Sequence, residues 1–300
     1  MKFTFIEQNR SAFPVSLLCD LMQVARSSFY AYLKRRSAEP SQRQKENEVL
    51  LDKIKIIFEA SKQRYGSPRI HAALQQQGER CSLGRVKRLM RRAGLYAVSG
   101  KKFKPKRERT AKLETKNLLL EHNIRPTTIN QVWHTDITYV PTAEGWLYLA
   151  GVMDGFSKRL VGYAMDSNMK TDLVILALRS AVTRRKPGKG LIHHGDRGAQ
   201  YTSYRYQHEL DSQNMLASFT GTGACLDNAV MESFWATLKK ELVYPSEPFK
   251  TRDEARRAIF EYIEVFYNRE RLHSSLLYKT PEGFELTQQP QSEALLQVAA

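Results

Sequence analysis

Cysteine is scarce in this sequence of 300 residues, and its three copies, Cys19, Cys81 and Cys225, lie far apart with no Cys-x-x-Cys pair. A disulfide framework or a zinc site built from thiolates is therefore not expected. Long apolar runs are missing too, because no stretch approaches the ~20 residues that a membrane-spanning helix needs. The N-terminal residues lack the apolar segment of a signal peptide, so we expect a cytoplasmic protein with no membrane partner.

Acidic residues are too few to balance the basic ones. The chain has 47 Lys and Arg against 31 Asp and Glu, which gives a formal net charge of +16 and a pI of about 9.7. The excess lies in residues 1–128, which hold 28 basic and 11 acidic side chains, and residues 61–112 alone hold 16 basic and two acidic ones. Such a stretch is typical of a surface that follows a phosphate backbone. A solvated face is one alternative interpretation. An acidic-lipid surface is a weaker one, because no amphipathic helix here pairs its Lys and Arg with large exposed aromatics.

The first hundred residues predict short helices of the size found in helix-turn-helix domains. The first pair covers residues 15–21 and 29–36, with a break near 26–28. A longer helix covers 42–62, and a second pair covers 68–77 and 82–93. The second helix of such a pair lies in the DNA major groove. The candidate recognition helix carries five basic side chains, Arg85, Lys87, Arg88, Arg91 and Arg92. A helical hairpin that these residues only keep in solution is the alternative.

A basic stretch without periodicity follows and predicts a linker between two domains. We expect a helical DNA-binding region at 1–97, a basic linker at 98–125, a second domain at 126–287 and a disordered tail at 288–300. Lys101 and Lys102 of the linker are expected to contact DNA.

The second domain alternates strands and helices after an initial meander. Three strands followed by helix, strand, helix, strand and helices predict an α/β layered fold. The expected strands are 132–140, 146–153, 159–165, 191–194 and 215–219, and the expected helices are 171–185, 203–213, 228–242 and 252–267.

Three carboxylates stand where this layout would bring them together. Asp136 lies mid-strand in WHTDITY, Asp196 directly follows a strand in HHGDRGAQYTS, and Glu232 lies one turn into a helix in DNAVMESFWATLK. Phosphodiester chemistry with two divalent ions requires carboxylates from separate elements to converge, and Mg²⁺ prefers such oxygen ligands. Each acid taken singly can also be an ordinary strand, turn or helix residue.

The segments around these acids resemble those of bacterial insertion-sequence transposases of the IS-three group, which are relatives of retroviral integrases. The resemblance runs from about residue 15 to residue 285 and includes YGSPRIHAALQQQG with SLGRVKRLMRRAGL, the three acid motifs, and the tail YNRERLHSSLLYKTP. It implies a ribonuclease-H-like integrase catalytic core, with a mixed five-stranded sheet flanked by helices, and an N-terminal all-α helix-turn-helix region.

By this resemblance Asp136, Asp196 and Glu232 form a triad that holds Mg²⁺, with Mn²⁺ able to substitute, for strand nicking by water and strand transfer by a 3′-hydroxyl. Lys239 lies two helical turns after Glu232 and is expected to reach a DNA phosphate, with a plain surface lysine as the alternative. The implied partners are double-stranded DNA at the element ends and target, further copies of the chain in a synaptic complex, and an upstream-frame protein joined by ribosomal frameshifting.

Two other functions stay open: a non-enzymatic DNA-binding regulator of transposition with a decayed core, and a metal-dependent nuclease of the same fold that joins no strands. Several polar residues also lack a clear role. Asp154 ends a strand, where turn formation competes with metal binding. The tail residues Asn268, Arg269, Arg271 and His273 either brace the core or contact DNA. The group commonly shows Ser where Gly195 stands.

Overall fold

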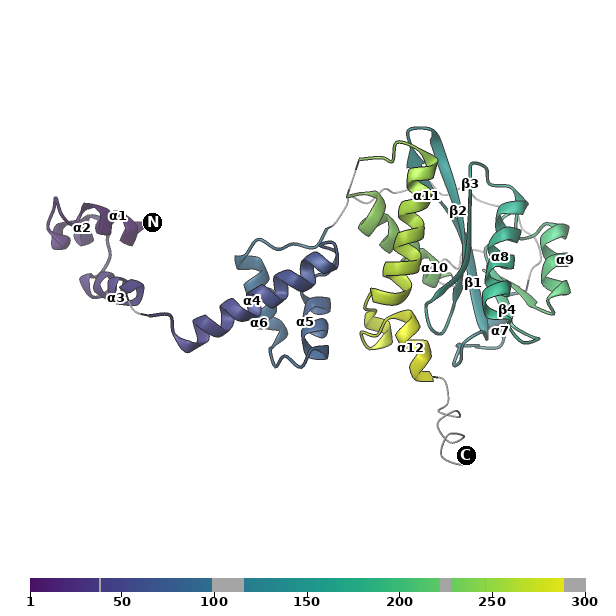
Figure 1. The fold of residues 1–300 in the computed structure, drawn as a ribbon, viewed down its shortest axis with the longest axis horizontal. Helices are drawn as coiled ribbons and strands as arrows, with labels where there is room; N and C mark the ends of the chain where they lie inside the picture. The colour runs from purple at the N-terminus through teal and green to yellow at the C-terminus, as the bar shows by residue number, and fades with distance from the viewer. Residues whose placement is uncertain (38, 99–115, 222–227, 246, 289–300) are drawn as a thin grey trace, which may run out of the picture. The chain divides into compact units, whose positions relative to one another are not determined.

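The computed structural model describes residues 1–37, 39–98, 116–221, 228–245 and 247–288 (Figure 1). They fall into two compact units, Met1–Ile56 and Ile57–Ala300. Within the described ranges, no helix has the length and apolar character that a membrane span requires. The expected linker lies largely outside these ranges, as do Lys101 and Lys102 and nearly all of the expected tail, so the domain boundaries stay predictions.

The first unit contains α1 (Lys2–Asn9), α2 (Val15–Leu21), α3 (Arg26–Ser37) and most of α4 (Gln42–Ala60). Its small core is built from Ile6, Leu18, Cys19 and Phe29. Helices α2 and α3 match the predicted pair, except that α3 begins at Arg26, where the break was expected. The sequence pattern does not predict α1, because Ile6 is the one buried residue among its eight and no apolar periodicity marks the helix.

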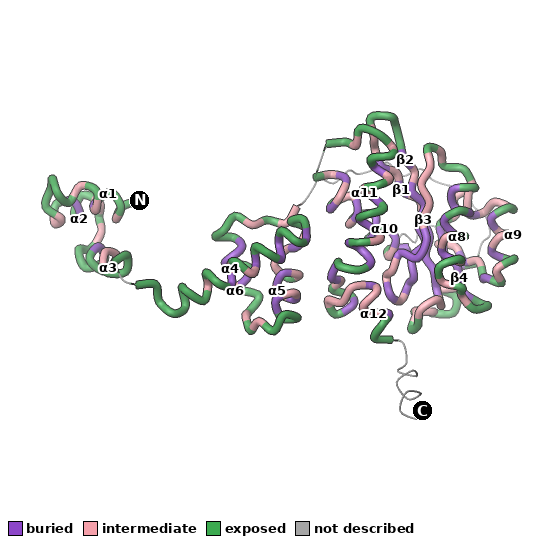
Figure 2. Tube along the Cα trace, in the orientation of Figure 1, coloured by how far each residue is buried: buried purple, intermediate pink, exposed green. Residues whose placement is uncertain are grey.

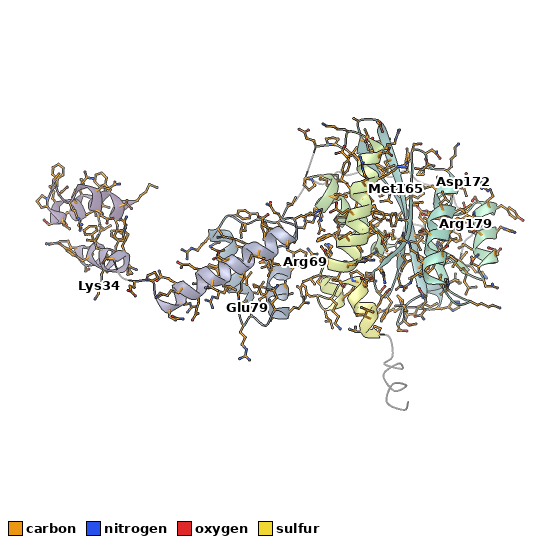
Figure 3. The ribbon with its side chains drawn as sticks, viewed as in Figure 1. Lys34, Arg69, Glu79, Met165, Asp172 and Arg179 are labelled. Atoms are coloured by element: carbon orange, nitrogen blue, oxygen red, sulfur yellow. The ribbon has the colours of Figure 1, made fainter. Side chains whose placement is uncertain are left out.

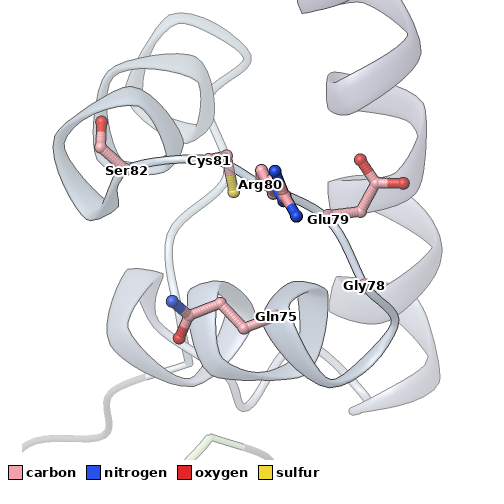
Figure 4. Close-up of a pocket in the computed structure, with 6 residues that line it drawn as sticks. All are labelled: Gln75, Gly78, Glu79, Arg80, Cys81 and Ser82. Atoms are coloured by element: carbon pink, nitrogen blue, oxygen red, sulfur yellow. The ribbon is translucent and has the colours of Figure 1, made fainter.

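The second helix pair, α5 (Ser67–Gln76) and α6 (Leu83–Arg92), opens the second unit. Gly78 has a φ of +83°, which favours glycine, and allows the turn between the helices. Figure 4 shows this turn, where Gln75 and the residues from Gly78 to Ser82 surround an open hollow. The Ser82 side chain accepts a hydrogen bond from the backbone N–H of Arg85, which caps α6.

A five-stranded sheet forms the centre of the second unit, as predicted. Its strands are β1 (Val132–Thr142), β2 (Gly145–Asp154), β3 (Leu160–Asp166), β4 (Ile192–Gly195) and β5 (Leu216–Phe219), in the order β3-β2-β1-β4-β5. The meander β1-β2-β3 is antiparallel, whereas β4 pairs in parallel with both β1 and β5. The sheet is therefore mixed, with β1 at the junction of its two halves.

Helices cover both faces of this sheet (Figure 1). On one side lie α8 (Thr171–Arg185) and α9 (Tyr204–Ser212), and on the other α10 (Ala229–Leu238) and α11 (Arg252–Glu261). Figure 2 shows that the strands between them are mostly buried. Gly162 of β3 lets α8 pack closely, because a Cβ there would lie 2.5 Å from the carbonyl oxygen of Ala177. A short helix, α7 (Leu118–Glu121), precedes the sheet in the chain.

The C-terminal part extends the predicted helices by π-helical turns. Helix α10 continues into η1 (Lys239–Val243) and α11 into η2 (Tyr262–Glu270), and the chain then forms the short η3 (Ser274–Leu276) and α12 (Pro281–Gln288). The predicted helix limits near 242 and 267 agree with these extensions, although their wider winding has no signal in apolar spacing. Helix α12 docks through Glu285, whose carboxylate binds Arg159 and Arg185 at 2.8 Å.

Candidate active site

Two of the three predicted acids stand level with each other on neighbouring strands. In the parallel β1–β4 pair, His134 lies opposite His194. Asp136 follows two residues later on β1, and Asp196 follows two residues later, directly after the end of β4. The carboxyl end of β4 therefore brings Asp196 to the level of Asp136.

Helix α10 brings the third acid to the same face of the sheet. Its start is fixed by Asn228, whose side-chain amide donates to the carbonyl oxygen of Thr135 at 3.0 Å. Two turns further on, the indole Nε1 of Trp235 donates to Oδ2 of Asp136 at 3.0 Å. Glu232 is on the same side of the helix as Trp235, three residues earlier, and is exposed to solvent.

A glycine makes room for this contact. Gly151 of β2 is the cross-strand partner of Asp136. A Cβ at Gly151 would lie 2.8 Å from the indole ring of Trp235, which is closer than side chains pack. The missing side chain thus allows the ring to lie over the strand and reach the carboxylate.

The three carboxylates interact electrostatically. Burial raises the pKa of Asp136 to about 7, and the negative charges of Asp196 and Glu232 add to the rise. Hydrogen bonds from the Ile137 backbone N–H and from Trp235 oppose it. The pKa of Asp196 is also raised by desolvation, against the hydrogen bond that the Gly198 N–H donates to its side chain. Crowding of like charges is the condition that a bound cation would relieve.

The donor chemistry fits magnesium, because the three side chains offer carboxylate oxygens. Their arrangement is not yet that of a closed metal site. Among the residues that the structure describes, no three His, Cys, Asp or Glu side chains are gathered closely enough to hold a metal ion. Residues 222–227, which directly precede α10, are outside that set. The structure thus brings the acids within electrostatic range of one another rather than into common coordination.

Lys239 lies near this group of acids. Its Nζ is 4.6 Å from the centre of the Tyr139 ring, a cation–π contact. Burial lowers the pKa of Lys239, and the negative charge of Asp136 acts against that shift. Lys239 is half-buried, so the structure places its charge beside the acids rather than on an open surface.

The basic residues of α6 lie mainly on its solvent side. Val86, Leu89 and Met90 are buried and form its inward face. Lys87, Arg88, Arg91 and Arg92 are exposed, whereas Arg85 is half-buried. Four of the five predicted recognition-helix residues are therefore accessible to DNA.

Asp154 is a structural residue of a turn. It is fully buried, and its carboxylate accepts hydrogen bonds from the backbone N–H groups of Asn130 at 2.7 Å, Phe156 at 3.0 Å and Ser157 at 2.9 Å. These donors occupy the oxygens that a metal would need, so the turn interpretation holds.

The polar tail divides into bracing and exposed residues. Asn268 is buried and binds both the N–H and the carbonyl of Leu160, at 3.1 and 3.0 Å. Arg271 forms a buried ion pair with Glu241 at 2.7 Å. Arg269 keeps 60% of its side chain exposed and lies 3.6 Å from Glu282. Asn268 and Arg271 therefore brace the core.

The chain matches three family descriptions. "HTH-like domain" covers residues 44–103, and two descriptions of an "Integrase core domain" cover residues 113–225 and 213–281. Together with the mixed sheet and its flanking helices, these matches define a DNA-strand transferase with an integrase core and a helix-turn-helix-like region.

Curated relatives identify the family. The chain is 40% identical over 285 residues to the transposase InsF for insertion sequence IS3A of Escherichia coli. The match covers 95% of this chain and 98% of that protein. It is 44% identical over 247 residues to the transposase for insertion sequence element IS904 of Lactococcus lactis, and this match covers 82% of this chain and 97% of that protein. The chain belongs to the IS3 family of insertion-sequence transposases. It therefore binds DNA and acts in DNA transposition as a polynucleotidyl transferase.

Solved structures of retroviral integrases are more distant. The HTLV-2 integrase catalytic core domain in complex with magnesium is 17% identical, with a TM-score of 0.38, and the match covers 54% of this chain and 99% of that one. The simian T-cell lymphotropic virus intasome is also 17% identical, with a TM-score of 0.46, covering 73% and 71%.

Proposed function

We propose that Asp136, Asp196 and Glu232 are the catalytic acids of this transposase and that they hold Mg²⁺, for which Mn²⁺ can substitute. The observation that carries the proposal is the convergence of three carboxylates from β1, the end of β4 and α10, close enough for two of them to raise the pKa of the third. Such perturbed acids are typical of functional sites.

When bound, divalent ions would activate the attacking water or 3′-hydroxyl and stabilise the leaving oxygen. The protein's own contribution is to orient the ligands. The Ile137 N–H and the Trp235 indole each donate to one oxygen of Asp136, which restrains its carboxylate. Lys239 supplies a positive charge beside the acids, where it would attract a backbone phosphate.

The DNA partner would be bound by the basic first part of the chain. The exposed residues Lys87, Arg88, Arg91 and Arg92 of α6, together with Arg85, would enter the major groove at the element ends. Lys101 and Lys102 would add phosphate contacts. The action would take place in the cytoplasm, on double-stranded DNA, with several copies of the chain in the synaptic complex. An upstream-frame protein joined by frameshifting would be a further partner.

The test is incubation of the purified chain with labelled DNA that carries candidate element ends, in Mg²⁺ or EDTA. Wild type is compared with Glu232→Gln, a substitution that removes the charge and preserves the shape. Joined strands that appear only with wild type and Mg²⁺ support the proposal. Cleavage without joining would indicate a nuclease, and end binding without cleavage, also when fused to the upstream frame, would indicate a regulator.

A further inference from the structure

Helix α10 carries two hydroxyl side chains on a face beside the one that meets the acids. Glu232, Trp235 and Lys239 recur at three- and four-residue intervals and lie along the face that meets Asp136. Ser233 and Thr237 also lie four residues apart, on a neighbouring face of the same helix. They line a pocket of about 260 Å³ that lies next to the candidate active site.

Cationic side chains from three other segments enter this pocket. They are Arg69 of α5, Lys158 of the β2–β3 turn, and Arg271 after η2. Figure 3 labels Arg69 on α5, where its Nε donates to the carbonyl oxygen of Leu272 at 2.9 Å. No carboxylate occurs among the residues that line the pocket in the described part of the chain.

The positive charge of this pocket is only partly balanced. Glu241 pairs with Arg271 at 2.7 Å and lies 3.8 Å from Arg69, so one carboxylate serves two guanidinium groups. Lys158 donates to the carbonyl oxygen of Gly155, and the buried carboxylate of Asp154 acts on its charge without forming an ion pair within 4 Å. The excess of positive charge also acts on His273. Burial lowers the pKa of His273 to about 3, and the charges of Arg271, Arg69 and Lys158 add to the shift.

Hydroxyl groups complete the lining. Ser233, Thr237, Ser274 and Ser275 all face the pocket, and their hydroxyls make no hydrogen bond to any described residue. Three of these residues are exposed, and Thr237 is half-buried. Hydroxyl groups without a described partner can donate hydrogen bonds to the oxygens of a phosphate, and the nearby positive charge would attract it.

We propose that this pocket binds one backbone phosphate of the DNA strand whose reacting phosphate lies at Asp136, Asp196 and Glu232. The inference rests on the proposed function of those acids and extends it to a second contact point. A helix is ~10 Å wide with its side chains, and successive phosphates of one strand rise ~3.4 Å along the duplex axis. The pocket phosphate would thus lie a few nucleotides from the scissile one, and holding it would fix the direction of the strand across α10.

The first experiment measures the affinity of the full chain for one labelled duplex in EDTA at several KCl concentrations. Lys158→Met removes a pocket charge, and Lys189→Met removes a charge from an exposed turn as a matched control. We expect Lys158→Met to reduce the slope of log affinity against log salt by about 1, as for one lost phosphate contact. Lys189→Met should leave the slope unchanged. A slope equal to wild type in Lys158→Met overturns the proposal.

The second experiment uses a variant that cannot be explained by lost packing. Ser275→Glu places a carboxylate at the exposed mouth of the pocket, and Ser212→Glu is its surface control. We expect Ser275→Glu to weaken duplex binding by about tenfold, the order expected for a lost charge-assisted contact. Thermal unfolding of both variants checks that they fold.

The position of the contact is read from duplexes in which single phosphates are replaced by neutral methylphosphonates. Wild type should lose affinity at a position a few nucleotides from the scissile phosphate, as well as at its other phosphate contacts, and Ser275→Glu should be insensitive at that position alone. Equal sensitivity of wild type and Ser275→Glu at every position overturns the proposal. Because the assay contains no metal, it is independent of strand transfer, whose failure in wild type would instead count against the proposed catalytic function.

Discussion

The indole N–H of Trp235 donates to the carboxylate of Asp136 at 3.0 Å, across the space that Gly151 leaves open. The relationship links α10 to the central strand β1 at the point where the candidate active site is built. Trp235 therefore has two roles: its ring packs on the sheet, and its indole N–H donates a hydrogen bond to the carboxylate of Asp136.

Trp235→Phe tests this link, because phenylalanine keeps most of the ring and removes the donor. We expect the affinity for Mn²⁺ to fall about tenfold, as is usual when a partner that orients a metal ligand is lost. Stability should fall by about 1 kcal/mol. Calorimetric titration with Mn²⁺ measures the first effect, and Trp146→Phe, at an exposed position, is the control. Unchanged Mn²⁺ affinity would show that the hydrogen bond does not orient Asp136.

Gly151→Ala tests the space beneath the ring. The added Cβ would lie 2.8 Å from Trp235 and 3.2 Å from Leu160, so the ring must shift. Overpacking of this kind costs about 1–3 kcal/mol, and strand transfer should fall with it. Urea unfolding measures the loss. Gly188→Ala, with no atom within 4 Å of the new Cβ, should unfold like wild type. Equal stability of both variants would contradict the packing account.

Arg271→Ala tests the buried ion pair of the tail. Removal of the guanidinium takes from the buried Glu241 its nearer ion-pair partner and leaves Arg69 at 3.8 Å, and breaking a buried ion pair typically costs about 3–5 kcal/mol. The exposed neighbour Arg269 is the control, and Arg269→Ala should change the free energy of unfolding by less than about 0.5 kcal/mol. If both variants lose equal stability, the division of the tail into bracing and exposed residues is wrong.

The raised pKa of Asp136 predicts a pH dependence for metal binding. A carboxylate with a pKa of about 7 is largely protonated at pH 6, and a metal must displace that proton. Affinity for Mn²⁺ should therefore increase between pH 6 and pH 8, with release of a proton. Titrations in buffers of different ionisation enthalpy count the protons. No proton release at pH 6 would mean that Asp136 is already ionised there.

The same shift predicts the stability of the metal-free protein. Because the folded pKa of about 7 lies above the ordinary value of 3.8, the folded state binds the proton more tightly. The stability that Asp136 contributes is therefore present below pH 4 and is lost as the pH rises through 7. In EDTA, the free energy of unfolding of Asp136→Asn should be higher relative to that of wild type at pH 8 than it is at pH 5. A constant difference between the two at both pH values would contradict the shift.

The sequence was sufficient to predict the sheet, most helices, and the strand or helix on which each acid lies. Local periodicity indicates the strands and helices, and the motifs around the acids resemble those of IS3-group transposases. The partners of the acids were not predictable. Trp235 has the apolar character of an ordinary core residue, and its polar role depends on the absent side chain of Gly151, 84 residues earlier on another strand. The division of the tail likewise depends on Glu241 and Leu160, which only the fold brings to Arg271 and Asn268.

Gly195 illustrates the same limit. The expectation from the resemblance is a serine, but a Cβ at Gly195 would lie 2.8 Å from Cγ2 of Thr135. Thr135 is buried and its hydroxyl donates to the carbonyl oxygen of Gly151 at 3.0 Å. In this chain glycine in place of serine at position 195 therefore leaves room for the close approach of β4 to β1.

The most direct test of the central claim is the position of bound Mn²⁺ in crystals of the chain with DNA, located by anomalous scattering. We expect a peak coordinated by Asp136 and Asp196, with Glu232 completing the site, and loss of the peak in Asp136→Asn. A peak bound elsewhere, or strand transfer that persists in Asp136→Asn, would contradict it.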